Sequence, residues 1–93
     1  MTSEDITAVS QIDAACFEEP WPKNSFAYEL TTDYSICMVA TTPEMGVAAA
    51  IVVWLIADEA HIATIAVHPD AQGQGVGACL LAHALLVAHQ HGA

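Results

Sequence analysis

The residues of this sequence best suited to chemistry are three glycines spaced at every second position. They lie in the segment Gln72-Gly73-Gln74-Gly75-Val76-Gly77, which follows an apolar run ending at Val67 and precedes a long run of alanine and leucine. The first N–H groups of a helix lack backbone partners and lie at the positive end of the helix dipole, and glycines let an anion approach them closely. The spacing therefore predicts a phosphate-binding loop, with a glycine-rich turn that merely joins a strand to a helix as the alternative.

Two common nucleotide-binding loops are excluded by the residues around these glycines. A P-loop requires Lys followed by Ser or Thr after its last glycine, where this chain has Ala78 and Cys79. The dinucleotide fingerprint G-x-G-x-x-G is not matched either, and no acidic residue follows Asp70. We therefore expect neither a P-loop enzyme nor a dinucleotide-binding fold.

The periodicity of apolar residues around the loop predicts one small α/β (α+β) domain, which we assign to residues 1–93. Thr2 or Ser3 can cap a first helix, because acidic residues follow at once and apolar residues recur at helical spacing. The strand before the loop, 61–67, is apolar on both faces, which is typical of a central strand. In order, we expect helices at about 3–16 and 23–30, strands at 35–41, 46–56 and 61–67, the glycine loop, and a helix over 78–91.

The charge and the cysteines exclude several classes of function. Eleven acidic residues against one Lys give a formal charge of −10, so the chain has no cationic surface for nucleic acid. Three cysteines without a C-x-x-C pair argue against a disulfide framework, and we take them as reduced thiols of a cytoplasmic protein. The acidic N-terminus does not resemble a signal peptide, and the most apolar stretch, 46–57, is shorter than the roughly 20 residues that span a bilayer. We expect no nucleic-acid partner and no membrane anchor.

The histidines near the end of the sequence, His83, His89 and His91, do not predict a metal site. Neither 83/89 nor 89/91 is an i, i+4 pair, and we find no Cys or carboxylate that supports them as ligands. The expected helix that carries them has no charged residue on any face. That composition suggests burial on more than one side, by a partner or a second copy, with a plain alanine-rich helix as the alternative.

Seen with the strand before it, the loop 72–77 resembles motif A of the GNAT acetyltransferases, Q/R-x-x-G-x-G/A. Within that superfamily, segments 58–60 and 65–70 are similar to those of the ribosomal-protein-alanine N-acetyltransferases, the RimI type. Segments 14–17 and 20–26 resemble that group's Cys-Phe and Pro-Trp-Ser region between the first two helices. The resemblance covers nearly the whole chain.

This resemblance implies part of the acyl-CoA N-acyltransferase (GNAT) fold: two N-terminal helices, a three-stranded antiparallel sheet, the glycine loop and a long helix. It implies transfer of acetyl from acetyl-CoA to the α-amine of a protein N-terminus, which we expect to be the N-terminal Ala of a small-subunit ribosomal protein. The loop N–H groups would hold the CoA pyrophosphate, the strand would pair with the pantetheine arm, and Gln72 would add a polar contact. The cofactor-binding residues implied in this way are Ile65, Ala66, Val67, Gln72, Gly73, Gln74, Gly75, Val76, Gly77 and Ala78.

Three further residues are candidates for the acceptor side. His61, six residues before Val67, matches the position of a catalytic Glu in histone-acetylating members of the superfamily and could accept the proton of the amine. The alternative is a strand histidine with a satisfied hydrogen bond. Glu59 is either a second acid near the acceptor or a turn carboxylate in water. Trp21, between two prolines, is either a core anchor or a wall of the acceptor groove.

In the same family, the Glu and Tyr that move protons lie beyond the position of residue 93, so we expect these 93 residues alone to be inactive. We also expect self-association through strand edges or the uncharged last helix. The arginines that such enzymes carry around the loop are absent, which predicts weaker CoA binding. The remaining alternatives are a non-catalytic module that binds CoA or another chain, and an acetyltransferase for a small-molecule amine.

Overall fold

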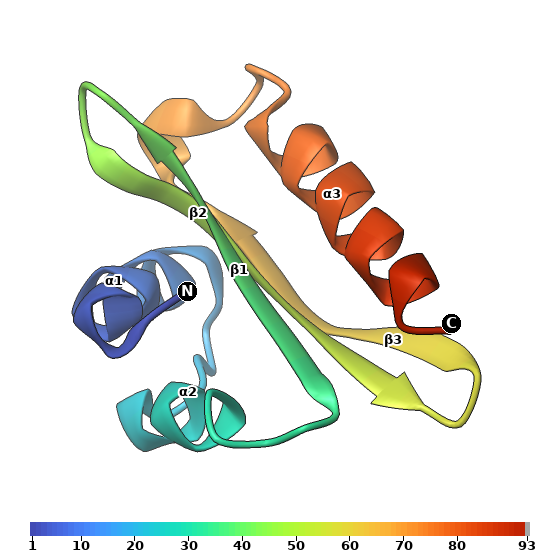
Figure 1. The fold of residues 1–93 in the computed structure, drawn as a ribbon. Coiled ribbons are helices and arrows are strands. Elements are labelled where there is room, and N and C mark those ends of the chain that lie inside the picture. Colours follow the sequence, from blue (N-terminus) through green and yellow to red (C-terminus); the bar gives the residue numbers. More distant parts are fainter. Residues whose placement is uncertain (93) are drawn as a thin grey trace.

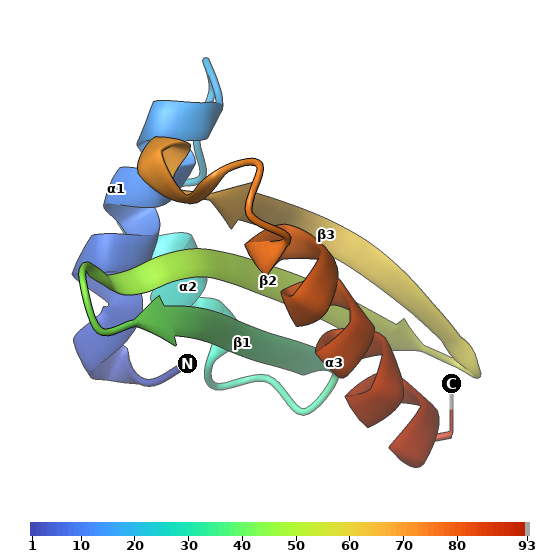
Figure 2. The same ribbon diagram turned by 90° about the horizontal axis from the view of Figure 1, so that it is seen from above.

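The computed structural model describes residues 1–92, and in them helices lie on both faces of a three-stranded sheet (Figure 1 and Figure 2). The elements in chain order are a 3-10 turn η1 (Ser3–Asp5), α1 (Ile6–Cys16), α2 (Lys23–Glu29), β1 (Ser35–Thr42), β2 (Gly46–Ile56), β3 (Glu59–Val67), a second 3-10 turn η2 (Pro69–Ala71) and α3 (Val76–Gln90). The predicted order of helices and strands is confirmed.

The N-terminal segment starts with a capped turn. The Thr2 N–H donates to Asp5 Oδ2 at 2.9 Å, and the Asp5 N–H donates to the Thr2 carbonyl at 3.0 Å. This closes the first turn and leads directly into α1. One stripe of α1 is buried, consisting of Ile6, Val9 and Ile12, and this spacing turns the helix toward the sheet.

The sheet is antiparallel in the order β1-β2-β3, so β2 is its central strand. The prediction of a central strand at 61–67 is therefore not met within residues 1–92. Within residues 1–92, β3 has a neighbouring strand on one side only, and His61 and Ile62 at its start are exposed. The prediction failed because apolar residues on both sides of a strand indicate that other elements pack on both faces of the sheet, and say nothing about how many strands lie beside it. In β2 the residues 48–53 are at most 4% exposed.

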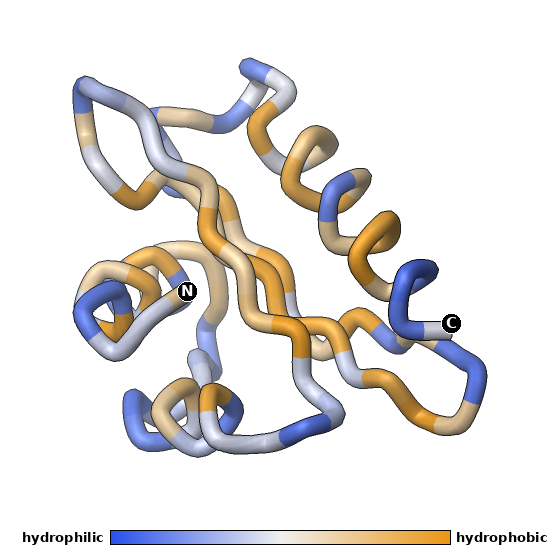
Figure 3. The backbone as a smooth tube through the Cα atoms, in the orientation of Figure 1, coloured by the Kyte–Doolittle hydropathy of each residue, from blue (hydrophilic) through white to orange (hydrophobic). Residues whose placement is uncertain are grey.

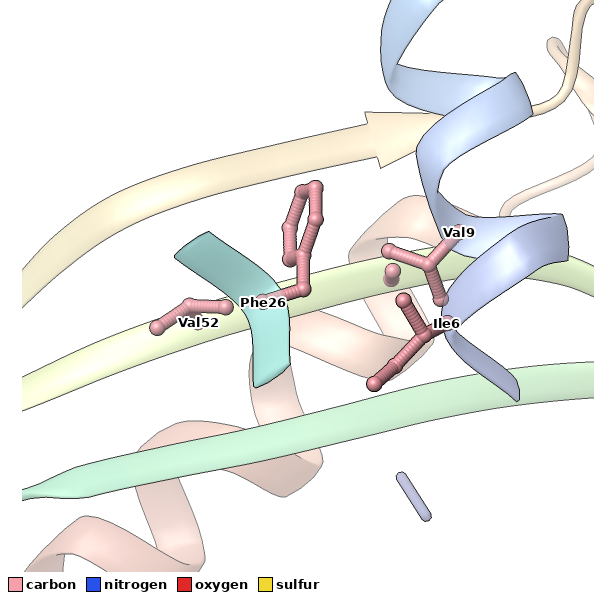
Figure 4. Packing of buried hydrophobic residues seen from close by; sticks show 5 residues of the cluster. Ile6, Val9, Phe26 and Val52 are labelled. Carbon is pink, nitrogen blue, oxygen red and sulfur yellow. The ribbon is translucent and has the colours of Figure 1, made fainter. Parts of the chain in front are cut away.

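Alternate residues of β2 face two separate apolar clusters, as the two-residue period of a strand requires. The cluster on the face of α1 and α2 contains Ile6, Val9, Phe26, Ala50 and Val52 (Figure 4). The cluster on the face of α3 contains Ala49, Ile51, Val53, Leu80 and Ala84. The two helical layers are thus fixed to opposite faces of one strand.

The last helix, α3, buries a single stripe made of Leu80, Ala84 and Ala88. Figure 3 shows that apolar residues recur along the helix, and on its outer side Leu85 and Leu86 are 44% and 54% exposed. Burial on more than one side, which the uncharged sequence suggested, is therefore not found within residues 1–92. None of the helices in that range is long and apolar enough to cross a bilayer.

Candidate functional site

The glycine loop joins the end of β3 to the start of α3 and needs its glycines for two different reasons. Gly73 and Gly75 have φ angles of +81° and +79°, a region that glycine enters without strain. Gly77 has no positive φ, but a Cβ there would lie 2.9 Å from Val67 Cγ2. The start of α3 therefore packs too closely on β3 to leave space for a side chain.

The same loop presents backbone donors without partners. The first hydrogen bond of α3 runs from the Cys79 N–H to the Gly75 carbonyl at 3.0 Å. Within residues 1–92, no backbone N–H group from Gly73 to Ala78 donates a hydrogen bond of ordinary length and angle to another group of the protein. A Cβ built at Gly73 or Gly75 would have nothing within 4 Å, so the space on the Cβ side of these two residues is open. Free N–H groups at a helix N-terminus suit phosphate oxygens, so these residues fit the pyrophosphate of a CoA.

One carbonyl oxygen at the end of β3 holds the adjoining segments together. Cys16 Sγ at the end of α1 donates to the Val67 carbonyl at 3.2 Å, and Gln72 Nε2 donates to the same oxygen at 3.1 Å. The Gln72 side chain thus fixes the loop to the strand. A contact between Gln72 and the cofactor stays a prediction.

In the part of the chain that the structure describes, no lysine or arginine lies at the loop. The one Lys, Lys23, donates to Thr7 Oγ1 at 2.8 Å, next to α1. On the strand side of the loop, His68 Nδ1 accepts the Asp70 N–H at 3.0 Å, which requires this nitrogen to be unprotonated. Binding of an anion here would therefore depend on backbone donors and the helix dipole.

A cavity of about 630 Å³ opens beside β3, against the segment that joins α1 to α2. Its lining consists of Phe17, Glu18, Glu19, Trp21, Ile62, Ala63, Thr64 and Ile65. The segment is held by Asp13, a carboxylate only 2% exposed, whose Oδ2 accepts the Trp21 N–H at 2.7 Å. The structure thus brings Trp21 and Ile65, two of the predicted site residues, to one cavity.

Sequence reasoning missed the other residues of this segment. Phe17, Glu18 and Glu19 line the cavity. Phe17 belongs to the segment 14–17 that resembles the family, but its place in a cavity was not predicted, and Glu18 and Glu19 lie between the two segments that carry the resemblance. The buried Asp13 was missed as well. Its position beside the apolar stripe of α1 was the available signal, because an acid that turns toward a core needs a partner there.

His61 and Glu59 contact each other at the start of β3. His61 Nε2 lies 3.1 Å from Glu59 Oε2, and the two side chains are 49% and 70% exposed. Neither residue lines the cavity beside β3. The pair is therefore separate from Trp21 and Ile65, and its predicted role in catalysis is not tested by this arrangement.

A second cavity of about 420 Å³ lies between β1 and the start of α3, and Gln74, Gly75 and Val76 of the loop contribute to it. Cys79 and His83 also line it, with Cys79 Sγ 3.7 Å from His83 Nδ1. Cys79 thus lies at i, i+4 from His83, and His83 Nδ1 is also 3.0 Å from the Cys79 carbonyl, a contact within one turn of the helix. Among residues 1–92, no three His, Cys, Asp or Glu side chains come together to hold a metal ion.

The fold and the loop define the class of protein: the family model of the acetyltransferase (GNAT) family matches residues 6–93, and the chain belongs to that family. Over 85 residues it is 33% identical to a protein of Bacillus subtilis (strain 168) named as a putative [ribosomal protein bS18]-alanine N-acetyltransferase. That match covers 91% of this chain and 56% of the relative.

Solved structures agree with this assignment. The ribosomal-protein-S18-alanine N-acetyltransferase of Escherichia coli has a TM-score of 0.86 and 28% identity, over 99% of this chain and 58% of that one. The aminoglycoside 6'-N-acetyltransferase AAC(6')-Ig of Acinetobacter haemolyticus, at 13% identity and a TM-score of 0.78, shares the fold over 98% of this chain and 70% of that one. The chain thus spans a little over half the length of the two relatives that are named for ribosomal protein bS18 or S18.

Proposed function

We propose that this chain carries the acetyl-CoA-binding part of an N-acetyltransferase that modifies a protein N-terminus. The observation that carries the proposal is the row of unpaired N–H groups from Gly73 to Ala78, at the start of α3, in a chain of the GNAT family. These donors would hold the CoA pyrophosphate.

The edge of β3 would bind the rest of the cofactor. The Val67 carbonyl points to Cys16 and Gln72 and away from β2, and in a strand the N–H of the same residue points to the same side. The edge from Ile65 to Val67 therefore offers backbone groups to a pantetheine arm. Acetyl-CoA supplies an acyl group activated as a thioester. An N–H group of β3 would stabilise negative charge on the acyl oxygen.

The acceptor amine would enter the cavity beside β3. Glu18 and Glu19 at this cavity suit a protonated amine as it approaches. We propose the α-amine of an N-terminal Ala on a small-subunit ribosomal protein as the acceptor, and the cytoplasm as the place of reaction. The support for this choice is that the relatives from Bacillus subtilis and Escherichia coli are named for alanine acetylation of bS18 and S18.

His61 is our candidate for removing the proton from the amine, because it directly precedes Ile62, the first residue of β3 that lines this cavity, although its own side chain lies outside the lining. If Nε2–H donates to Glu59 Oε2, the lone pair of the His61 ring lies on Nδ1, and Nδ1 is then the atom that accepts the proton. Glu59 would hold the ring in this tautomer. If the His61→Gln variant transfers acetyl at an unchanged rate at every pH, this assignment is wrong.

The first experiment is a titration of the purified chain with acetyl-CoA, followed through the amide NMR signals of Gly73, Gly75 and Gly77. We expect saturable shifts at these three glycines. The matched control is CoA without its acetyl group, which should move the same signals. A folded chain whose glycine signals do not respond to either compound contradicts the proposal.

The acceptor is tested separately, with the full product of the gene. A peptide that begins with Ala and follows the S18 N-terminus should gain an acetyl group, detected by mass spectrometry, while the same peptide with a blocked α-amine should not. Transfer to an aminoglycoside or polyamine and not to the peptide would show that the acceptor has been assigned wrongly.

A further inference from the structure

A smaller cavity of about 280 Å³ shares Trp21 with the cavity beside β3. It is lined by Trp21, Pro22, Ser25, Glu29 and Trp54. Trp54 of β2 pairs with His61 of β3. The next residue of β3, Ile62, lines the larger cavity. The two cavities therefore occupy neighbouring positions on the α1–α2 segment and on the sheet.

Glu29 gives the smaller cavity a negative charge without a counter-ion. The residue is only 6% exposed, and its Oε2 accepts hydrogen bonds from the Ser35 hydroxyl and from Trp54 Nε1, the latter at 3.1 Å. Its Oε1 accepts none from any group within residues 1–92. Carboxylates removed from water are normally paired with a cation, and here both donors are neutral. Among residues 1–92, no side-chain oxygen is both buried and without a partner, so Oε1 keeps contact with solvent and is accessible to a positively charged ligand.

The aromatic rings around Glu29 suit the same ligand. Trp21 and Trp54 are stacked with centroids 6.2 Å apart and planes inclined by 21°, and Phe26 lies 5.3 Å from Trp21. The face of an indole ring attracts a cation, and a planar guanidinium also stacks on it. A carboxylate beside two indoles therefore favours Arg over a compact ammonium group.

We propose that this cavity is a subsite for an arginine side chain of the acceptor, close behind the reacting N-terminus. The inference rests on the proposed function, which places the α-amine in the neighbouring cavity. Trp21 lines both cavities, so an acceptor whose N-terminus lies in the larger cavity passes Trp21 on its way to the smaller one. An extended peptide advances about 3.3 Å per residue, so one of its first few side chains would reach Glu29. The formal charge of −10 attracts a basic acceptor at long range.

Tryptophan fluorescence tests the subsite without any acetyl transfer, because both tryptophans of the chain line this cavity. The probes are short peptides that begin with Ala and carry one Arg at the second, third or fourth position. Each is compared with a peptide in which the uncharged isostere citrulline replaces Arg. We expect a saturable fluorescence change, and for one position a Kd at least about tenfold lower with Arg, as a charge-assisted hydrogen bond would give.

Variants assign the effect to one carboxylate. Glu29→Gln keeps an oxygen that can accept from Ser35 and Trp54 but removes the charge, so the preference for Arg should disappear. Glu44→Gln, an exposed residue that lines neither cavity, makes the same chemical change and should leave the preference intact. Equal Kd values for Arg and citrulline peptides in the unmodified chain, or no saturable change with any peptide, would overturn the subsite.

Failure of the subsite can be told apart from failure of the proposed function. Glycine signals that respond to acetyl-CoA, together with equal affinity for Arg and citrulline peptides, would remove the subsite alone. A preference for Arg in a chain whose glycine signals ignore acetyl-CoA would leave a peptide-binding site and remove acetyl transfer.

Discussion

Replacement of Gly77 by Ala measures how closely α3 approaches β3. The added Cβ would lie 2.9 Å from Val67 Cγ2, which is about 0.5 Å inside the 3.4 Å at which ordinary contact begins. Relief of this overlap requires the Val67 side chain or the start of the helix to move, and overpacking of this kind costs about 1–3 kcal/mol. Ala in place of a helical Gly returns up to about 1 kcal/mol. We therefore expect the free energy of unfolding to fall by about 1 kcal/mol.

The assay is urea unfolding, followed by circular dichroism, of the wild type, Gly77→Ala, Val67→Ala and the double variant. Since Val67→Ala removes the methyl group that the new Cβ meets, the cost of the overlap disappears in the double variant, which should lose about 2 kcal/mol less than the sum of the single losses. Gly75→Ala is the control. It strains a residue at φ +79° that has nothing within 4 Å, so its cost should add to that of Val67→Ala. If Gly77→Ala also adds to Val67→Ala within about 0.3 kcal/mol, the close approach is refuted.

Three further predictions concern other parts of the molecule. Asp13→Ala leaves the Trp21 N–H without its acceptor, so stability should fall by about 1–3 kcal/mol and the Trp21 amide should exchange faster; an unchanged exchange rate would contradict the anchoring role. The formal charge of −10 repels an anionic ligand, and salt screens this repulsion. Raising NaCl from about 0.02 M to about 0.2 M should therefore lower the Kd for acetyl-CoA several-fold, as measured by calorimetry. A higher Kd would indicate cationic groups at the loop. Iodoacetamide at about pH 8 should modify Cys79 before Cys37, because the Cys79 side chain is exposed. For Cys37, burial and then the charge of Glu29 raise the pKa of the thiol and so reduce its reactive thiolate fraction. Equal labelling rates by mass spectrometry would count against the last of these.

Much of the fold could be predicted from the sequence because local chemistry determines it. Thr2 and Asp5 close the first turn as their side chains allow, and the apolar stripe of α1 follows with helical spacing. Gly73 and Gly75 have the positive φ angles for which a tight loop selects glycine. In such places the residue types alone leave few conformations.

The sequence could not predict what depends on contacts between distant segments. The edge position that β3 has within residues 1–92 was missed, because apolar faces indicate covering helices and contain no information about strand order. The cavity beside β3 depends on the buried Asp13, which accepts an N–H eight residues later in the chain. The Glu29 cavity depends on Trp54, which lies 25 residues further along. No local spacing relates these partners.

The Val67 carbonyl accepts hydrogen bonds from both Cys16 and Gln72 and so links two segments of the chain. Cys16 precedes the segment that lines the cavity beside β3, where the acceptor is proposed to bind, and Gln72 begins the loop that would bind the cofactor. A shift of either segment would therefore strain the hydrogen bond of the other. Coupling of this kind is reciprocal in free energy. If acetyl-CoA lowers the Kd of a peptide by some factor, the peptide must lower the Kd of acetyl-CoA by the same factor. Removal of the Cys16 thiol should abolish this mutual effect, while the Kd of each ligand measured alone stays the same.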